Sequence, residues 1–183
     1  TRETDRCKNF FALGLMFWLY GRPIDPDAFQ PYLRDEETLA RPWAIPGTPG
    51  LEHRIGGLES EEPSGDVSYL PENHERMVQL RADKVAGIAN DIAPVEVNGA
   101  DRGELLVVGW GGTHGAIATA VEEARADGLD VSSIHLRHLN PFAANLGEVL
   151  RGFDRVLVPE RNLGQLSRLL RAEFLVPAES LGK

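Results

Sequence analysis

Residues 104–115, Glu-Leu-Leu-Val-Val-Gly-Trp-Gly-Gly-Thr-His-Gly, decide the fold of this chain. An apolar, β-branched run ends there in glycines, an alanine-rich segment follows, and a second apolar run occupies residues 131–139. This order is typical of a parallel strand–helix–strand unit, whose strands are covered on both faces and therefore apolar throughout. The stretch predicts an α/β fold with an open sheet.

The same alternation continues to the end of the chain. We expect strands at residues 105–109, 131–136 and 155–159 and a fourth near Ser180, and helices at residues 115–127, 143–151 and 163–173. Strands that alternate with helices of about 10–15 residues predict right-handed crossovers and a mostly parallel sheet.

The first hundred residues differ in character. Residues 8–20 are apolar on nearly every side, so a helix there must be covered all round by protein. Residues 21–65 are rich in proline and glycine, which predicts a long loop, and its aromatic residues argue against disorder. Residues 71–90 predict an amphipathic helix, with Met77, Leu80, Val85 and Ile88 near one face.

Composition narrows the classes of function. Lys and Arg number 19 against 28 Asp and Glu, and the formal charge of -9 argues against a nucleic-acid partner. One cysteine, Cys7, excludes an internal disulfide framework and a Cys-rich metal site. The longest apolar run falls short of the roughly 20 residues that span a bilayer, and the start has no secretory pattern. We expect a cytoplasmic protein with no membrane contact.

The glycine-rich corner that follows the first strand is one candidate site. Backbone N–H groups of Gly111, Gly112, Thr113 and His114 could hold a phosphate or carboxylate where a helix begins. The pattern matches a dinucleotide fingerprint only in part, because residues 137–138, Arg-His, replace the acidic residue expected after the next strand. A tight structural turn is the alternative and the commoner meaning of an isolated glycine motif.

The chain has five histidines, and no pair of them has ligand neighbours at metal spacing. We therefore expect no metal site. His135 lies inside a predicted strand and is expected to pack, whereas His114 could contact an anion or a partner.

Residues 42–59, PWAIPGTPGLEHRIGGLE, form the second candidate. Stiff prolines and glycines lead to a Glu-His-Arg triplet, in which His53 and Arg54 would sit on a preset backbone. A binding loop and a connector between domains explain this stretch equally well.

Four stretches carry a resemblance to a known family: RCKNFFALGL at 6–15, the loop at 42–59, LRHLNPF at 136–142 and VPERNLGQL at 158–166. Together they resemble the α subunit of 2-oxoacid:ferredoxin oxidoreductases, most closely the 2-oxoglutarate type. The resemblance covers almost the whole chain in separate blocks.

The resemblance implies thiamine diphosphate-dependent oxidative decarboxylation of a 2-oxoacid, with the acyl group passing to coenzyme A and the electrons to ferredoxin. It also implies a β subunit that holds the thiamine diphosphate, magnesium and an iron–sulfur cluster, in a heterodimer or heterotetramer. Residues 104–183 match the family's transketolase C-terminal-like domain. We carry over no catalytic residue, and we expect this chain alone to bind no cofactor.

One departure from the family concerns domain organisation. Family members have a pyrimidine-binding domain, with a Tyr-Pro-Ile-Thr-Pro motif, between the stretches that match residues 1–23 and residues 27 onward. Residues 24–27 therefore look like a join, and we expect no activity without the β subunit and that domain. The predicted parts are a remnant helix of a preceding domain (1–26), a Pro/Gly-rich arm (27–70), an amphipathic helix with a linker (71–103) and the α/β domain (104–183).

Two other functions fit the residues. A stand-alone α/β module could bind a nucleotide or an acidic metabolite at the glycine-rich corner without catalysis, or the chain could be a non-catalytic scaffold.

Overall fold

A computed structural model describes residues 25–182. Contacts within the chain divide it into two units, Thr1–Lys84 (unit 1) and Val85–Lys183 (unit 2), and each is described by itself. Cys7, the apolar segment 8–20 and most of the predicted remnant helix lie outside the described residues. The predicted domain limits and the join at residues 24–27 stay predictions.

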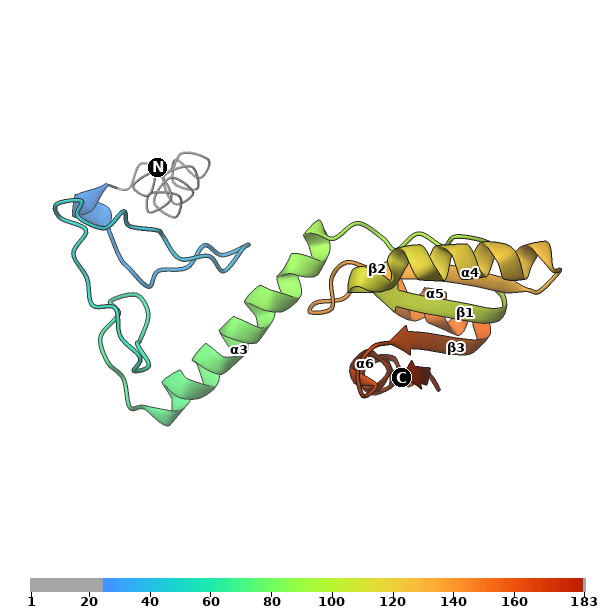
Figure 1. The fold of residues 1–183 in the computed structure, drawn as a ribbon. Helices are drawn as coiled ribbons and strands as arrows, with labels where there is room; N and C mark the ends of the chain where they lie inside the picture. Colours follow the sequence, from blue (N-terminus) through green and yellow to red (C-terminus); the bar gives the residue numbers. More distant parts are fainter. Residues whose placement is uncertain (1–24, 183) are drawn as a thin grey trace, which may run out of the picture. The chain divides into compact units, whose positions relative to one another are not determined.

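Unit 2 is built on a parallel sheet. Its strands are β1 (Gly103–Trp110), β2 (Val131–Leu136), β3 (Phe153–Glu160) and β4 (Glu179–Gly182). They lie in the order β2-β1-β3-β4, and every neighbouring pair is parallel (Figure 1). The α/β fold with an open parallel sheet is therefore confirmed, including the short last strand near Ser180.

Helices cover both faces of this sheet (Figure 1). They are α4 (His114–Ala126), α5 (Leu146–Arg151) and α6 (Gln165–Phe174). Successive side chains of a strand point to opposite faces. Leu106 and Val108 of β1 accordingly join the buried cluster that includes α5 and α6, whereas Val107 packs with Ile117 and Val121 of α4. Burial on both sides explains why residues 105–108 of β1 are all apolar.

Unit 1 is mostly loop. Its regular elements among the described residues are the short helix η1 (Pro26–Ala28) and most of α3 (Pro71–Gly87), with an isolated bridge between Ser60 and Val67. Carboxylates hold the loop against the helix: Glu59 pairs with His74 (2.6 Å) and Arg81 (2.8 Å). Glu62 pairs in the same way with Arg76 at 2.8 Å. The prediction of a long loop is confirmed for the described residues 25–65.

The predicted amphipathic helix is confirmed as α3, which is followed by η2 (Ile88–Asp91), but its apolar face is only partly covered. Met77 is 1% exposed, whereas Val85 and Ile88 are 39% and 48% exposed. These two residues follow Lys84, the last residue of unit 1. Within residues 25–182, no helix is long and apolar enough to cross a membrane.

Candidate functional site

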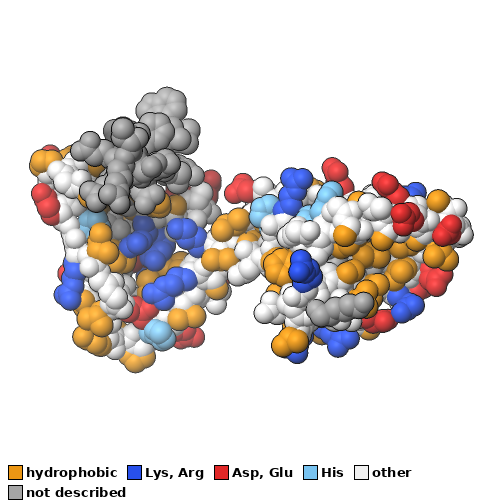
Figure 2. Space-filling view, viewed as in Figure 1, with side chains coloured by type: hydrophobic (Ala, Val, Ile, Leu, Met, Phe, Trp, Pro, Cys, Tyr) orange, Lys and Arg blue, Asp and Glu red, His pale blue; other side chains and the backbone are white. Residues whose placement is uncertain are grey.

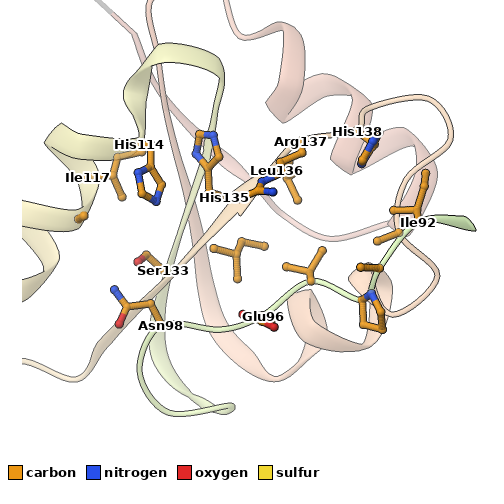
Figure 3. Close-up of a pocket in the computed structure, with 16 residues that line it drawn as sticks. Ile92, Glu96, Asn98, His114, Ile117, Ser133, His135, Leu136, Arg137 and His138 are labelled. Carbon is orange, nitrogen blue, oxygen red and sulfur yellow. The ribbon is translucent and has the colours of Figure 1, made fainter.

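A cavity of about 700 Å³ opens at the carboxyl end of β2 (Figure 3). The end of β2, the start of α4 and the segment 92–98 form its walls. The segment is tied to the sheet because Asn98 and Ser133 exchange backbone hydrogen bonds of 2.8 and 3.0 Å. Ligands of open α/β sheets bind beyond the carboxyl ends of the strands, so this is the expected end of the sheet for a site.

Two histidines meet in this cavity. The rings of His114 and His135 lie edge to face, with centroids 4.8 Å apart (Figure 3). Burial lowers the pKa of His135 below its ordinary value, and the neighbouring His114 and Arg137 lower it further. The buried Nδ1 atom of His135 has no hydrogen-bond partner among the described residues. A neutral imidazole with an unused nitrogen can take one hydrogen bond from, or give one to, a bound ligand.

Charged groups complete the walls. Arg137 and His138 follow β2 directly, and Glu96 lies on the facing segment (Figure 3). The guanidinium of Arg137 and the imidazoles of His135 and His138 suit a ligand that carries a carboxylate or phosphate. The arrangement can bind and orient such a group.

The glycine-rich corner forms the start of α4. Residues Gly111–Thr113 make the short helix η3, and Gly111 takes the left-handed φ of +58° that favours glycine. The Thr113 hydroxyl accepts a hydrogen bond from the Trp110 N–H (3.2 Å) and donates one to the Trp110 carbonyl (2.8 Å). The side chain of Thr113, the residue just before α4, makes no capping hydrogen bond to that helix, and η3 leads directly into it.

The start of α6 is capped from within. The Asn162 carboxamide accepts from the N–H groups of Gly164 and Gln165, and the Glu160 carboxylate accepts from those of Leu166 and Ser167. Burial would raise the pKa of Glu160, but these hydrogen bonds outweigh it and hold the pKa below the ordinary value. The start of α6 therefore has N–H donors satisfied by two side chains of its own unit.

The predicted site residues fall into two groups. Gly111, Gly112, Thr113 and His114 form one corner of unit 2, and His114 lines the cavity. His53 and Arg54 lie in unit 1, where His53 Nδ1 is 2.9 Å from the Leu51 carbonyl oxygen. A role for these six residues beside substrate or cofactor stays a prediction.

Sequence reasoning missed part of the cavity. It expected His135 only to pack, yet this half-buried residue lines the cavity with Arg137 and Glu96. The rule that ligands lie beyond the carboxyl ends of parallel strands could have selected residues 135–138. Glu96 has no such signal, because its segment reaches the site through the pairing of Asn98 with Ser133.

The described residues do not fit a metal centre. No group of three or more His, Cys, Asp or Glu side chains in residues 25–182 could hold a metal ion, and Cys7 lies outside that range. The family resemblance implies a magnesium ion and an iron–sulfur cluster. Ligands for these groups would have to come from outside the described part of this chain.

Comparison with known proteins bears on the whole chain. Residues 103–174 match the family described as pyruvate:ferredoxin oxidoreductase core domain II. The chain is 54% identical over 181 residues to the 2-oxoglutarate oxidoreductase subunit KorA of Mycobacterium tuberculosis, across 99% of this chain and 27% of that subunit. It is 30% identical over 162 residues to subunit alpha of 2-oxoacid:ferredoxin oxidoreductase 1 from Aeropyrum pernix, across 85% of this chain and 24% of that subunit.

A solved structure is similar as well. The 2-oxoglutarate:ferredoxin oxidoreductase from Magnetococcus marinus, with 2-oxoglutarate, coenzyme A and succinyl-CoA bound, matches with a TM-score of 0.77 and 30% identity. The match covers 84% of this chain and 27% of that one. The chain spans about a quarter of the length of these relatives.

Proposed function

Since this chain is a relative of the α subunits of 2-oxoacid:ferredoxin oxidoreductases, we propose that it is part of such an enzyme, of the 2-oxoglutarate type. The observation that carries the proposal is the 54% identity with a 2-oxoglutarate oxidoreductase subunit across 99% of this chain. The enzyme would decarboxylate the 2-oxoacid oxidatively, giving an acyl-CoA and reduced ferredoxin. Thiamine diphosphate supplies the carbanion chemistry of such a reaction when it is bound.

We assign this chain a supporting role in the assembly. The cavity residues can orient an anion, but the described residues contain no metal-ligand group. The β subunit would therefore hold the thiamine diphosphate, magnesium and the iron–sulfur cluster, in a heterodimer or heterotetramer. Exposed apolar side chains in unit 1 support a protein partner, since Ile55 is 84% and Tyr69 83% exposed. We also propose a cytoplasmic location, which the single cysteine supports.

Coexpression with a candidate β subunit tests the proposal. We expect the two chains to copurify and to reduce ferredoxin or a viologen when 2-oxoglutarate and coenzyme A are supplied. A complex without turnover would keep the subunit assignment and indicate that turnover also needs the pyrimidine-binding domain that the resemblance implies. Failure of the folded chain to bind any β subunit of this family would overturn the proposal.

The cavity at the end of β2 favours one alternative, a stand-alone module that binds a nucleotide or an acidic metabolite. A ligand that binds only the native state raises the melting temperature. A rise with nucleotides, combined with no copurifying β subunit, would favour the module over the oxidoreductase.

A further inference from the structure

A second cavity, of about 530 Å³, lies within unit 1. Four permanently cationic side chains line it, Arg34, Arg41, Arg81 and Lys84, and Glu59 is the one carboxylate among the lining residues. Figure 2 shows Lys and Arg side chains gathered over this unit. The concentration of positive charge is unexpected in a chain whose formal charge is -9.

Two of the guanidinium groups are held on one wall. The Arg34 side chain is only 11% exposed and lies 3.6 Å from the Glu62 carboxylate, which also accepts the Arg34 backbone N–H at 3.1 Å. The buried Nη1 atom is the one that faces Glu62, and it makes no hydrogen bond with any described residue. The Arg41 guanidinium lies over the Tyr32 ring at 4.2 Å. Both cations are therefore positioned before any ligand arrives.

The other wall is helix α3. Arg81 and Lys84 are three residues apart, so they lie on the same face of the helix. Arg81 is paired with Glu59 at 2.8 Å. Lys84 makes no ion pair with any described residue, which leaves its ammonium group available to the cavity.

The cations act on one another. Burial lowers the pKa of Arg34, Glu62 opposes that change, and Arg41 and Arg81 add to the lowering. The pKa of the Tyr32 phenol is also lowered, first by its hydrogen bond with Ser60 and then by Arg41, against the effect of burial. The part of each shift that comes from Arg41 is an effect of neighbouring positive charge, which a bound anion would relieve.

We infer that this cavity binds a small molecule through a phosphate or pyrophosphate group, held by Arg34, Arg41 and Lys84. Guanidinium forks match phosphate oxygens, and several cations suit a polyanion better than a single carboxylate. The volume falls within the range of small-molecule sites. Gly57 also lines the cavity. A Cβ atom at this position would have no other atom within 4 Å, so this part of the wall leaves room for a ligand. The inference does not depend on the proposed oxidoreductase activity.

Isothermal titration calorimetry of the full chain with inorganic pyrophosphate tests this site without a β subunit. We expect pyrophosphate to bind more tightly than phosphate, and acetate to give no measurable heat. Lys84→Gln and Arg41→Gln should each weaken pyrophosphate binding by about tenfold or more, because each removes one charge-assisted contact. Arg34 is left unchanged because its side chain is only 11% exposed, so its substitution would disturb the packing of the loop.

Arg76→Gln is the matched control. Arg76 lies on the same helix and carries the same charge, but it does not line the cavity, and its partner Glu62 keeps a second cation in Arg34. We expect its affinity to stay within about threefold of the parent, since screened charges beyond the contact shell act weakly. Unchanged circular dichroism and urea unfolding would show that each variant is folded. An equal loss in Arg76→Gln, or no pyrophosphate binding by the folded parent chain, would overturn the inference.

Discussion

The imidazole of His114 meets that of His135 edge to face, with ring centroids 4.8 Å apart. The two residues come from the start of α4 and from β2, which the parallel pairing of β1 with β2 brings together. Burial lowers the pKa of His135, and the positive charges of His114 and Arg137 lower it further.

The titration of His135 tests this relationship. Its pKa should lie below the ordinary histidine value of 6.5, because of burial first and of His114 and Arg137 second. His114→Gln removes one positive neighbour and should raise the pKa of His135, measured by NMR of the imidazole protons. An unchanged pKa in that variant would show that the two rings are not coupled.

The same shift has a consequence for stability. A folded-state pKa below the unfolded value means that the unfolded chain binds more protons as the pH falls. The contribution of His135 is therefore fully present above pH 6.5 and is lost as the pH falls through the folded-state pKa. The free energy of unfolding can be measured by urea titration at several pH values between about 7.5 and 5. It should depend less on pH in His135→Gln than in the parent chain.

Glu160 is predicted to stabilise unit 2 as a buried cap of α6. It is 3% exposed and accepts hydrogen bonds from the N–H groups of Leu166 (2.9 Å) and Ser167 (3.1 Å). Glu160→Gln should lower the free energy of unfolding by roughly 1–3 kcal/mol, because the amide cannot accept both bonds. Glu173→Gln, at an exposed position of the same helix, should leave stability unchanged in the same urea titration.

The pH dependence of the Glu160→Gln effect checks the role of the ionised carboxylate. The pKa of Glu160 is held below its ordinary value of 4.5, so its contribution is present above pH 4.5 and is lost as the pH falls through the folded-state pKa. The difference between the parent and Glu160→Gln should shrink in that acid range. A difference that stays constant there would contradict the role given to the ionised carboxylate.

Gly109 is predicted to be required by packing at the end of β1. A Cβ atom there would lie 2.6 Å from Ile117 Cδ1 and 3.3 Å from His135 Nδ1. Gly109→Ala should therefore destabilise unit 2 by roughly 1–3 kcal/mol and displace His135. Gly115→Ala is the control, because nothing lies within 4 Å of its Cβ position in α4. The control should be neutral or more stable by up to about 1 kcal/mol, since alanine favours a helix.

The sheet could be predicted from the sequence because each strand is a local signal. β2 was placed at residues 131–136 with the bounds that the structure has, since an apolar, β-branched run marks a buried strand. The start of α5 was placed three residues early, at Ala143 instead of Leu146. The Asn145 side chain explains the difference: it bonds the backbone of Val95 at 2.8 and 3.0 Å, a contact between residues 50 positions apart.

The two cavities could not be predicted from local sequence patterns, because each is formed by residues that only the tertiary structure brings together. His114 could be selected as a candidate because it follows a glycine-rich turn, but its contact with His135 requires the strand pairing. In unit 1, Arg34 and Arg81 come from a loop and a helix whose mutual placement depends on the ion pairs of Glu59 and Glu62. Neither pairing leaves a periodic signal in the sequence.

Replacement of a segment in a full-length relative tests the central claim most directly. Residues 103–174 of this chain would replace the matching segment of the Mycobacterium tuberculosis subunit KorA, and the chimera would be purified with its β subunit. We predict 2-oxoglutarate-dependent reduction of ferredoxin close to that of the unmodified enzyme, because the exchanged α/β unit would serve the same assembly. A chimera that folds and assembles normally but reduces no ferredoxin would contradict this account.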